Sequence, residues 1–262
     1  MMNLSLQSKT ALVCGASQGI GRAIAIALAD LGANCVLLAR NEEALKEAIA
    51  QLNTSEGQKH HYAVVDFTDL DRLKLVIAEL NTKYEIDILI NNTGGPAAGL
   101  IASADASAFE LAFRQHLICN HILAQAVIPH MKEKGWGRII NVISTSVKIP
   151  INNLGVSNTI RAAVASWAKT LSNELAAHGI TVNSLLPGFI STTRLDAVAE
   201  GFAAREGVDK ETMLQTMKNS VPAKRFGAPA EIAAVAAFVA SPAASYLNGI
   251  TIPVDGGRTG SI

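Results

Sequence analysis

The sequence contains few aromatic residues, no excess of either charge and only three cysteines. Aromatic residues make up 5% of the 262 residues and hydrophobic residues 49%, so the core must consist mainly of Ala, Val, Ile and Leu side chains. The formal net charge is zero and no dense run of Lys and Arg occurs, which argues against a nucleic-acid or anionic-membrane partner. Cys14, Cys35 and Cys119 lie far apart without metal-ligand spacing. We therefore interpret them as reduced thiols and expect no bound metal.

Long apolar runs are missing as well. No run reaches the roughly 20 residues that a membrane-spanning helix needs. The first residues, MMNLSLQSKTALVCG, lack the basic segment and apolar stretch of a signal peptide. Together these absences predict a soluble, cytoplasmic protein.

Short apolar runs alternate along the whole chain with longer segments that have helical periodicity, such as NEEALKEAIAQL and DLDRLKLVIAELNTKY. This alternation predicts one α/β domain over residues 1–262, a doubly wound parallel sheet of about seven strands with helices on both faces. The predicted strands are Ala11–Cys14, Asn34–Ala39, Tyr62–Val65, Ile86–Ile90, Arg138–Ile143, Thr181–Leu185 and Gly249–Pro253.

Polar and glycine residues mark several helix ends. Asn41 and Asp69 are predicted N-caps, and Gly32 is a predicted helix stop. Residues 192–220 interrupt the strand–helix alternation with a polar, partly helical segment. That segment is either a mobile lid beside a binding crevice or a pair of surface helices.

The stretch ALVCGASQGIGRAIAIAL predicts a strand, a tight glycine-rich turn and a helix. Gly15 permits the sharp turn, while Gly19 and Gly21 permit close approach of the backbone to a pyrophosphate. Free N–H groups and the dipole at the start of the helix favour the same anion. Because the turn lies at the first strand–helix junction of a predicted doubly wound sheet, it indicates a dinucleotide site.

The end of the second predicted strand indicates which dinucleotide binds. An NAD-selective site has Asp or Glu there to accept hydrogen bonds from the ribose 2′-hydroxyl. This chain has Arg40, whose guanidinium suits a 2′-phosphate, so we expect NADP(H). The alternative is that Arg40 only pairs with Glu42 or Glu43 on the surface.

The motifs GASQGIG, NNTGG from Asn91, GRIINVIS from Gly137, LLPGFI from Leu185 and IPVDGG resemble those of the short-chain dehydrogenase/reductase family. The resemblance is nearest to the 3-oxoacyl-acyl-carrier-protein reductases and spans essentially the whole chain. It implies a Rossmann-type fold and a small-molecule substrate. It also implies a homodimer or homotetramer formed through the long helices around residues 108–131 and 155–178.

The resemblance also implies a set of cofactor contacts. Carried over residue by residue, these are Ser17, Gln18, Ile20 and Gly21 at the pyrophosphate and adjacent ribose, Asp66 and Phe67 at the adenine, Asn92, Thr93 and Gly94 at the adenosine ribose, and Pro187, Gly188, Ile190 and Thr192 at the nicotinamide. Some of these positions also suit a purely structural role, since Asp66 can cap a helix and Asn91 and Asn92 can form a turn.

The catalytic positions depart from the family pattern. The family uses a serine, a tyrosine thirteen residues later, a lysine four residues after that and an asparagine on a preceding helix. Ser144 matches the serine, but the next two positions are Ser157 and Arg161. The asparagine position is His116, with Asn120 one turn later. No other register restores the motif, because none of the three tyrosines has a lysine four residues beyond it.

The replacements differ in what they offer chemically. An aliphatic hydroxyl such as that of Ser157 donates a hydrogen bond more readily than a proton, and Arg161 stays protonated at any relevant pH. His116, with an ordinary pKa of about 6.5, suits acid–base work, and Lys148 is a second candidate donor. The alternatives are that His116 bonds a neighbouring backbone carbonyl and that Lys148 is a solvated loop charge.

Two functions fit these residues. One is an NADP(H)-dependent oxidoreductase acting on a carbonyl or alcohol through a non-standard site, with a proton from His116, Lys148 or ordered water. The other is a catalytically inactive NADP(H)-binding protein, either a cofactor sensor or a structural subunit. We favour the enzyme because Ser144, Ser157, Asn158 and Arg161 keep the altered site polar.

Overall fold

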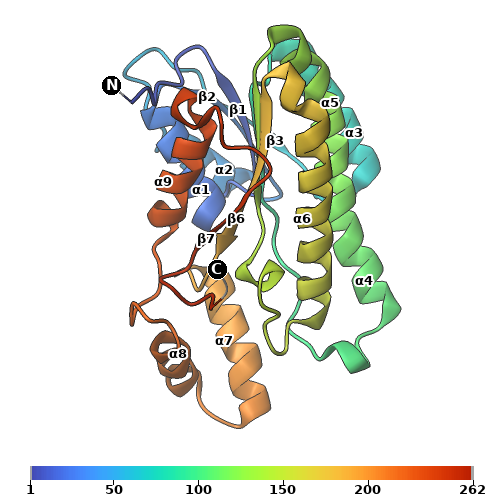
Figure 1. The fold of residues 1–262 in the computed structure, drawn as a ribbon, viewed down its shortest axis with the longest axis vertical. Coiled ribbons are helices and arrows are strands. Elements are labelled where there is room, and N and C mark those ends of the chain that lie inside the picture. Colours follow the sequence, from blue (N-terminus) through green and yellow to red (C-terminus); the bar gives the residue numbers. More distant parts are fainter. Residues whose placement is uncertain (1, 261–262) are drawn as a thin grey trace.

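Seven parallel strands form one sheet in the computed structural model, which describes residues 2–260 (Figure 1). Their spatial order is β3-β2-β1-β4-β5-β6-β7. The strands are β1 (Thr10–Cys14), β2 (Asn34–Ala39), β3 (His61–Val64), β4 (Ile88–Asn91), β5 (Gly137–Val142), β6 (Ile180–Pro187) and β7 (Thr251–Val254). All seven predicted strands are present, with ends shifted by no more than two residues, so the predicted sheet is confirmed.

Helices cover both faces of the sheet, which confirms the doubly wound arrangement (Figure 1). One face carries α1 (Gly19–Asp30), α2 (Glu42–Ile49) and α9 (Pro229–Ala240). The other carries α3 (Leu70–Lys83), α5 (Cys119–Lys134) and α6 (Gly155–Leu175), with α4 (Ala106–Phe113) packed against α6. Short turns of helix are η1 (Ile101–Ser103), η2 (Arg114–Ile118), η3 (Thr145–Val147), η4 (Ala176–His178) and η5 (Pro242–Ala244).

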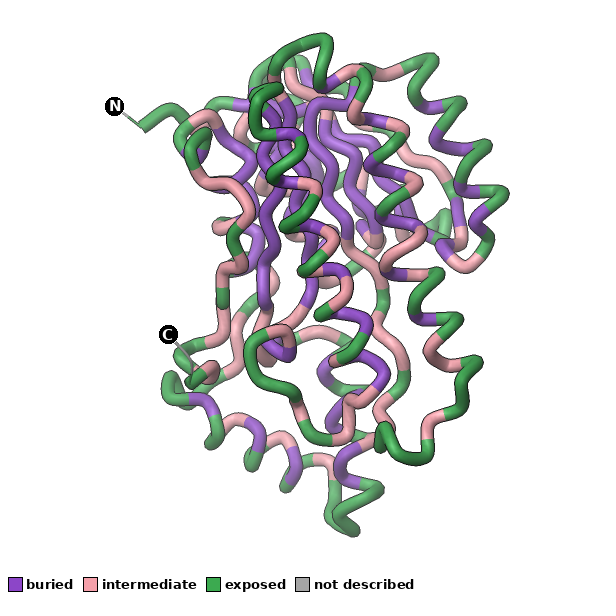
Figure 2. The backbone as a smooth tube through the Cα atoms, turned by 45° about the vertical axis from the view of Figure 1, so that its right-hand side comes forward, coloured by how far each residue is buried: buried purple, intermediate pink, exposed green. Residues whose placement is uncertain are grey.

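The central strands are buried on both faces of the sheet, because successive side chains point alternately to the two helical layers. In β1, Ala11 and Val13 belong to the core beneath α1 and α9, whereas Leu12 and Cys14 belong to the core beneath α3 and α5. Figure 2 shows the strands as a buried centre surrounded by helices with exposed outer faces. Cys14 on β1 and Cys35 on β2, which pairs with Ala11, are free buried thiols on opposite faces of the sheet, and burial raises the pKa of Cys35 to about 12.

The predicted helix signals act as expected. The side chain of Asn41 accepts a hydrogen bond from the Ala44 N–H at 3.0 Å and caps α2. Asp69 caps α3 in the same way through the Arg72 N–H, at 2.9 Å. Gly32 follows the end of α1 with φ +94°, a conformation that a side chain would strain.

The interrupting segment folds as two helices, α7 (Thr193–Glu206) and α8 (Lys210–Asn219), after the carboxyl end of β6. They extend below the rest of the molecule in Figure 1. Buried side chains of both helices, among them Phe202, Met213 and Met217, form a small cluster separate from the two sheet cores. The segment is therefore a packed helical pair. Between residues 2 and 260, no helix is long and apolar enough to cross a membrane.

Candidate active site

The glycine-rich turn between β1 and α1 depends on close backbone contacts. Gly15 and Gly19 have φ of +59° and +57°, where side chains are disfavoured. A Cβ on Gly15 would lie 2.5 Å from the Asn92 carbonyl oxygen. Asn92 in turn donates hydrogen bonds to the carbonyl oxygens of Cys14 and Gly15, at 3.2 and 3.3 Å. The loop after β4 and the turn thus hold each other in place.

Gly21 acts differently from the prediction that it permits approach to a pyrophosphate. It is buried in the first turn of α1, and a Cβ there would lie 2.2 Å from the Gly15 carbonyl oxygen. Gly21 does not line the cavity described next. Its role in the fold is to let α1 pack directly against the turn.

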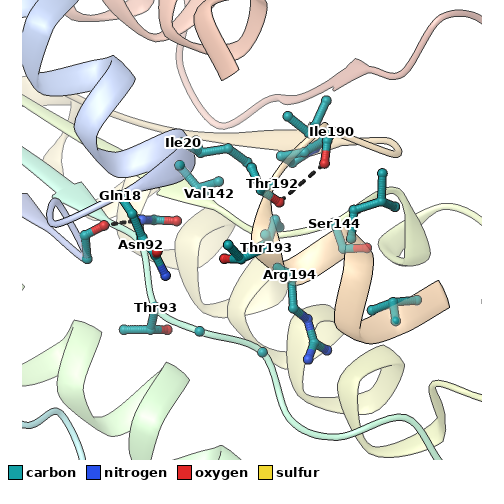
Figure 3. Close-up of a pocket in the computed structure, with 18 of the residues that line it drawn as sticks. Gln18, Ile20, Asn92, Thr93, Val142, Ser144, Ile190, Thr192, Thr193 and Arg194 are labelled. Atoms are coloured by element: carbon teal, nitrogen blue, oxygen red, sulfur yellow. Dashed lines mark hydrogen bonds between the residues drawn. The ribbon is translucent and has the colours of Figure 1, made fainter. Parts of the chain in front are cut away.

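A cavity of about 560 Å³ runs along the carboxyl ends of the strands, from the glycine turn to the first turn of α7 (Figure 3). It brings together most of the residues singled out from the sequence: Gly15, Ser17, Gln18, Gly19, Ile20, Arg40, Phe67, Asn92, Thr93, Gly94, Ser144, Ser157, Arg161, Pro187, Gly188, Ile190 and Thr192. Gly21, Asp66 and His116 do not line it. The tertiary fold therefore gathers both predicted halves of the site in one cavity.

Arg40 and Asp66 lie beside each other at one end of this cavity. Arg40 Nη1 is 3.9 Å from Asp66 Oδ2; the Arg40 side chain is largely exposed and that of Asp66 is half-buried. Glu42 and Glu43 pair with Lys46 instead, so the alternative pairing for Arg40 is wrong. The guanidinium of Arg40 remains accessible from the cavity.

Asp66 lines a small adjoining hollow together with Arg40, Phe67 and Gly94. Its carboxylate accepts hydrogen bonds from the N–H and the hydroxyl of Thr68, each at 2.8 Å. The proposal that Asp66 caps a helix is wrong, because Asp69 is the N-cap of α3.

Ser144, Ser157 and Arg161 converge at the other end of the cavity. Ser144 follows β5, and its Oγ accepts a hydrogen bond from the Ser146 N–H at 3.1 Å. Ser157 and Arg161 lie one turn apart on α6, and both are buried. They are four positions apart in the helix, so they share one face of α6.

The guanidinium of Arg161 contacts main-chain oxygens from two strand ends. Nη1 donates to the Val142 carbonyl at 3.2 Å and Nη2 to the Thr93 carbonyl at 3.4 Å. Burial, with a further contribution from the nearby Arg194, lowers the pKa of Arg161 to about 10. Arg161 therefore stays positively charged at neutral pH.

His116 lies behind the cavity wall, in the π-helical segment η2. It is buried, its Nδ1 lies within hydrogen-bond distance of the Thr93 hydroxyl, and its Nε2 has no partner among residues 2–260. Burial, then the charges of Arg161 and Arg194, lower the pKa of His116 to about 2. The imidazole is neutral at pH 7, so our expectation that it suits acid–base work there needs correction. The alternative of a backbone carbonyl partner is also not what is found.

Other candidate donors lie outside the cavity. Lys148 is exposed, beyond η3, and does not line the cavity. Of the tyrosines, Tyr62 donates to Glu42, Tyr246 is fully exposed and Tyr84 follows α3. The lining residues within 2–260 include no Tyr, Lys, His, Cys, Asp or Glu. In the same part of the chain, no three His, Cys, Asp or Glu residues cluster as metal ligands.

Two arginines of the cavity were missed from the sequence. Arg194, in the first turn of α7, donates from Nη2 to the Pro96 carbonyl at 2.6 Å. Arg258 stacks on the Phe189 ring, 4.2 Å from its centroid. The one available signal was the position of Arg194, two residues after Thr192 in a segment interpreted only as a lid or a helical pair.

Comparison with known proteins matches the chain over almost its full length. A family model described as enoyl-(acyl carrier protein) reductase matches residues 15–259. The NADPH-dependent reductase BacG of Bacillus subtilis (strain 168) is 34% identical, with 98% of this chain and 100% of that protein covered. The 3-oxoacyl-[acyl-carrier-protein] reductase FabG of Vibrio harveyi is 34% identical, with 97% of this chain and 98% of that protein covered.

Solved structures agree with the sequence comparisons. The crystal structure of L-sorbose reductase from Gluconobacter frateurii, complexed with NADPH and L-sorbose, superposes with a TM-score of 0.92. The two sequences are 30% identical, and all of both chains is covered. The likeness thus includes the fold and the whole length of the chain.

Proposed function

The chain belongs to the short-chain dehydrogenase/reductase family, and we propose that it is an NADP(H)-dependent oxidoreductase that acts on a carbonyl or alcohol through a non-standard site. One observation carries the proposal. A single cavity joins the glycine turn to Ser144, Ser157 and Arg161. A cofactor bound at the turn therefore has a polar reaction site within the same space.

NADP(H) fits the residues at the cofactor end. A Cβ on Gly15 would clash with Asn92, and both Gly15 and Gly19 have a positive φ, so the turn keeps its backbone free of side chains. This supports binding of a pyrophosphate by main-chain N–H groups at the start of α1. Arg40 offers an accessible guanidinium to the 2′-phosphate. The relatives named as NADPH-dependent support the same cofactor.

The other contacts follow from the family resemblance. Ser17, Gln18 and Ile20 lie along the pyrophosphate and ribose, Asp66 and Phe67 at the adenine, Asn92, Thr93 and Gly94 at the adenosine ribose, and Pro187, Gly188, Ile190 and Thr192 at the nicotinamide. Gly21 contributes indirectly, by letting α1 pack on the turn. When bound, the cofactor supplies or accepts the hydride.

The chain's own residues stabilise the charge that develops on the substrate oxygen. The hydroxyls of Ser144 and Ser157 donate hydrogen bonds to that oxygen, and the fixed positive charge of Arg161 lies beside them. One such oriented donor contributes about 10²–10³ in kcat in other enzymes. Since Ser144 Oγ accepts from the Ser146 N–H, its own proton is left to donate toward the cavity.

We propose water as the proton source. Within residues 2–260, arginine is the only ionisable residue type that lines the cavity, and a guanidinium does not give up its proton at neutral pH. A proton therefore reaches the substrate oxygen from solvent, passed along the Ser157 hydroxyl.

The lack of an ionisable donor also favours a second candidate, an NADP(H)-binding protein without turnover. One experiment separates the two. NADPH oxidation is followed against a panel of ketones, quinones and 3-oxoacyl thioesters, with wild-type protein and Arg161→Ala. Turnover that falls in Arg161→Ala supports the enzyme. Tight NADPH binding with no oxidation above background across the panel supports the second candidate and contradicts the first.

We further propose that residues 192–220 close over the bound cofactor and that the protein is a homodimer or homotetramer. The separate cluster of α7 and α8, with Leu195 and Val198 also lining the cavity, supports a lid that shifts as one unit. Slower hydrogen exchange in α7 on adding NADPH is the expected result, and unchanged exchange contradicts closure. Size-exclusion chromatography with light scattering checks the oligomer, and a monomer contradicts it.

A further inference from the structure

Two guanidinium groups from distant segments meet at the catalytic end of the cavity. A Cβ on Gly95 would lie 3.1 Å from Arg194 Nη2 and 3.5 Å from Arg161 Nη2. Arg161 comes from α6 and Arg194 from α7, and the loop at Gly95 brings their charged ends to one place. Figure 3 shows Arg194 pointing from α7 toward the loop that leaves Thr93.

Neither guanidinium has an acidic partner among residues 2–260. Both donate only to main-chain carbonyl oxygens, those of Val142, Thr93 and Pro96. The ion pairs of the described chain include neither arginine, and no Asp or Glu lines the cavity. Two like charges held together without a counter-charge are unfavourable, and a bound anion removes that penalty.

The phosphates of the cofactor do not serve this pair. Under the proposed function the pyrophosphate is bound by main-chain N–H groups at the Gly15 turn and the 2′-phosphate by Arg40, so both cofactor phosphates already have partners. Arg161 and Arg194 instead lie with Ser144 and Ser157, where the substrate reacts. The anion that completes the pair therefore belongs to the substrate.

The rest of this end of the cavity is apolar. Ile151, Leu154, Leu195 and Val198 line it together with the two arginines. A ligand that fits has one anionic group and an apolar body. A carboxylate suits the pair, because a planar guanidinium holds two carboxylate oxygens with parallel hydrogen bonds.

Building on the proposed function, we propose that the substrate is an oxo acid, or the corresponding hydroxy acid, whose carboxylate is held between Arg161 and Arg194. The carbonyl then lies toward Ser144 and Ser157, and the apolar body lies against Ile151, Leu154 and the start of α7. Arg194 acts as a specificity residue, because it lies on the segment that covers the cavity and selects charged over neutral carbonyl compounds.

Binding is measured first, with a probe that cannot be reduced. Calorimetry compares 4-methylpentanoate with its neutral amide, 4-methylpentanamide, on wild-type protein saturated with NADP⁺. The expected result is that the carboxylate binds at least about tenfold more tightly than the amide, as for a hydrogen bond to a charged group. Equal affinities overturn the inference, as does tighter binding of inorganic phosphate than of the carboxylate.

Variants of the two arginines test whether they cause the tighter binding of the carboxylate. Arg194→Gln and Arg161→Gln are expected to remove the tenfold preference for the carboxylate. Arg205→Gln is the matched control, since Arg205 on the same helix also donates to a loop carbonyl, that of Ala98 at 3.1 Å, but does not line the cavity. NADP⁺ binding verifies the fold of each variant, and Arg194→Gln carries the test if Arg161→Gln fails to fold. A preference that survives in Arg194→Gln overturns the inference.

Turnover separates this inference from the proposed function. NADPH oxidation is compared for 4-methyl-2-oxopentanoate and its neutral methyl ester. Faster oxidation with the acid, lost in Arg194→Gln, supports both. Turnover of neutral ketones without a preference for the acid overturns the inference and leaves the proposed function standing. Arginine-dependent carboxylate binding without any turnover contradicts the proposed function alone.

Discussion

The two ends of the cavity differ in the groups that form them. The end proposed to bind the cofactor is formed mainly by one continuous turn, residues 15–20, with Phe67 and residues 92–94 beside it and a single exposed charge, Arg40. The catalytic end consists of side chains from segments far apart in the sequence, Ser144, Ser157, Arg161 and Arg194. The first end depends on local backbone conformation and the second on tertiary packing. Substitutions at each end should therefore fail in different ways.

The largest expected effect is the loss of cofactor binding on substitution of Gly21. In Gly21→Ala the new methyl group meets the Gly15 carbonyl oxygen, so α1 must move away from the turn. We expect NADP(H) binding to fall below detection and the free energy of unfolding to drop by about 3 kcal/mol. Fluorescence titration and thermal unfolding measure the two effects. Gly201→Ala is the control, because its Cβ makes an ordinary contact of 3.4 Å with Ala98 and should leave binding intact.

The next largest effect is expected at the catalytic end, where a substitution should impair turnover but not cofactor binding. Arg161→Gln keeps hydrogen-bond donors but removes the fixed charge near Ser157. We expect kcat/KM for the preferred substrate to fall about a hundredfold, the range for loss of one group that stabilises the developing negative charge. The Kd for NADPH should change much less. A loss of NADPH affinity as large as the loss of kcat/KM would show that Arg161 serves the cofactor end instead.

Burial of His116 behind the catalytic end should make the free energy of unfolding depend on pH. Its folded-state pKa, lowered to about 2, is below the ordinary 6.5, so the unfolded chain binds more protons between these values. The stabilisation is complete above pH 6.5 and is lost as the pH falls below it. Between pH 7 and pH 5 the wild-type protein should lose about 2 kcal/mol of unfolding free energy through this group.

Urea unfolding at several pH values checks this expectation against two variants. His116→Gln should show a correspondingly shallower pH dependence. His178→Gln, at an exposed position, should behave like the wild type. Equal slopes for the wild type and His116→Gln would mean that His116 titrates normally in the folded protein.

The smallest expected effect is a difference between the affinities for NADP(H) and NAD(H). Arg40→Ala removes one exposed guanidinium at the end of β2. We expect NADP(H) affinity to fall about tenfold and NAD(H) affinity to stay unchanged, because only the former has a phosphate for Arg40 to bind. Titrations with both cofactors measure the difference, with Arg205→Ala as the surface control. An equal loss of affinity for both cofactors would show that Arg40 does not bind the 2′-phosphate.

Residues close in sequence were the ones that sequence reasoning predicted well. The seven strands, the caps at Asn41 and Asp69 and the positive φ of the turn at Gly15 are all indicated by residues within a few positions. Gly21 was interpreted less well, since its contact with the Gly15 carbonyl is visible only when helix and turn are packed. The distinction is between features that depend on periodicity or backbone conformation and features that depend on how two elements pack.

The catalytic end was predicted in part, through resemblance. Ser144, Ser157 and Arg161 were identified by their positions in a family pattern, and they do share the cavity. His116 was expected to suit acid–base work, yet it is buried behind Thr93 beside two positive charges. Arg194 was passed over because nothing near it in the sequence indicates that α7 reaches Gly95.

The sequence by itself determined the parallel sheet, the glycine turn and the basic residue at the end of β2. These features depend on periodicity and on backbone conformations that only certain residues adopt, which are properties of short segments. Tertiary structure alone decided which charges meet. Arg161 and Arg194 form a pair, and the pKa of His116 is lowered, because desolvation and Coulomb forces act across space between groups that are far apart in the sequence.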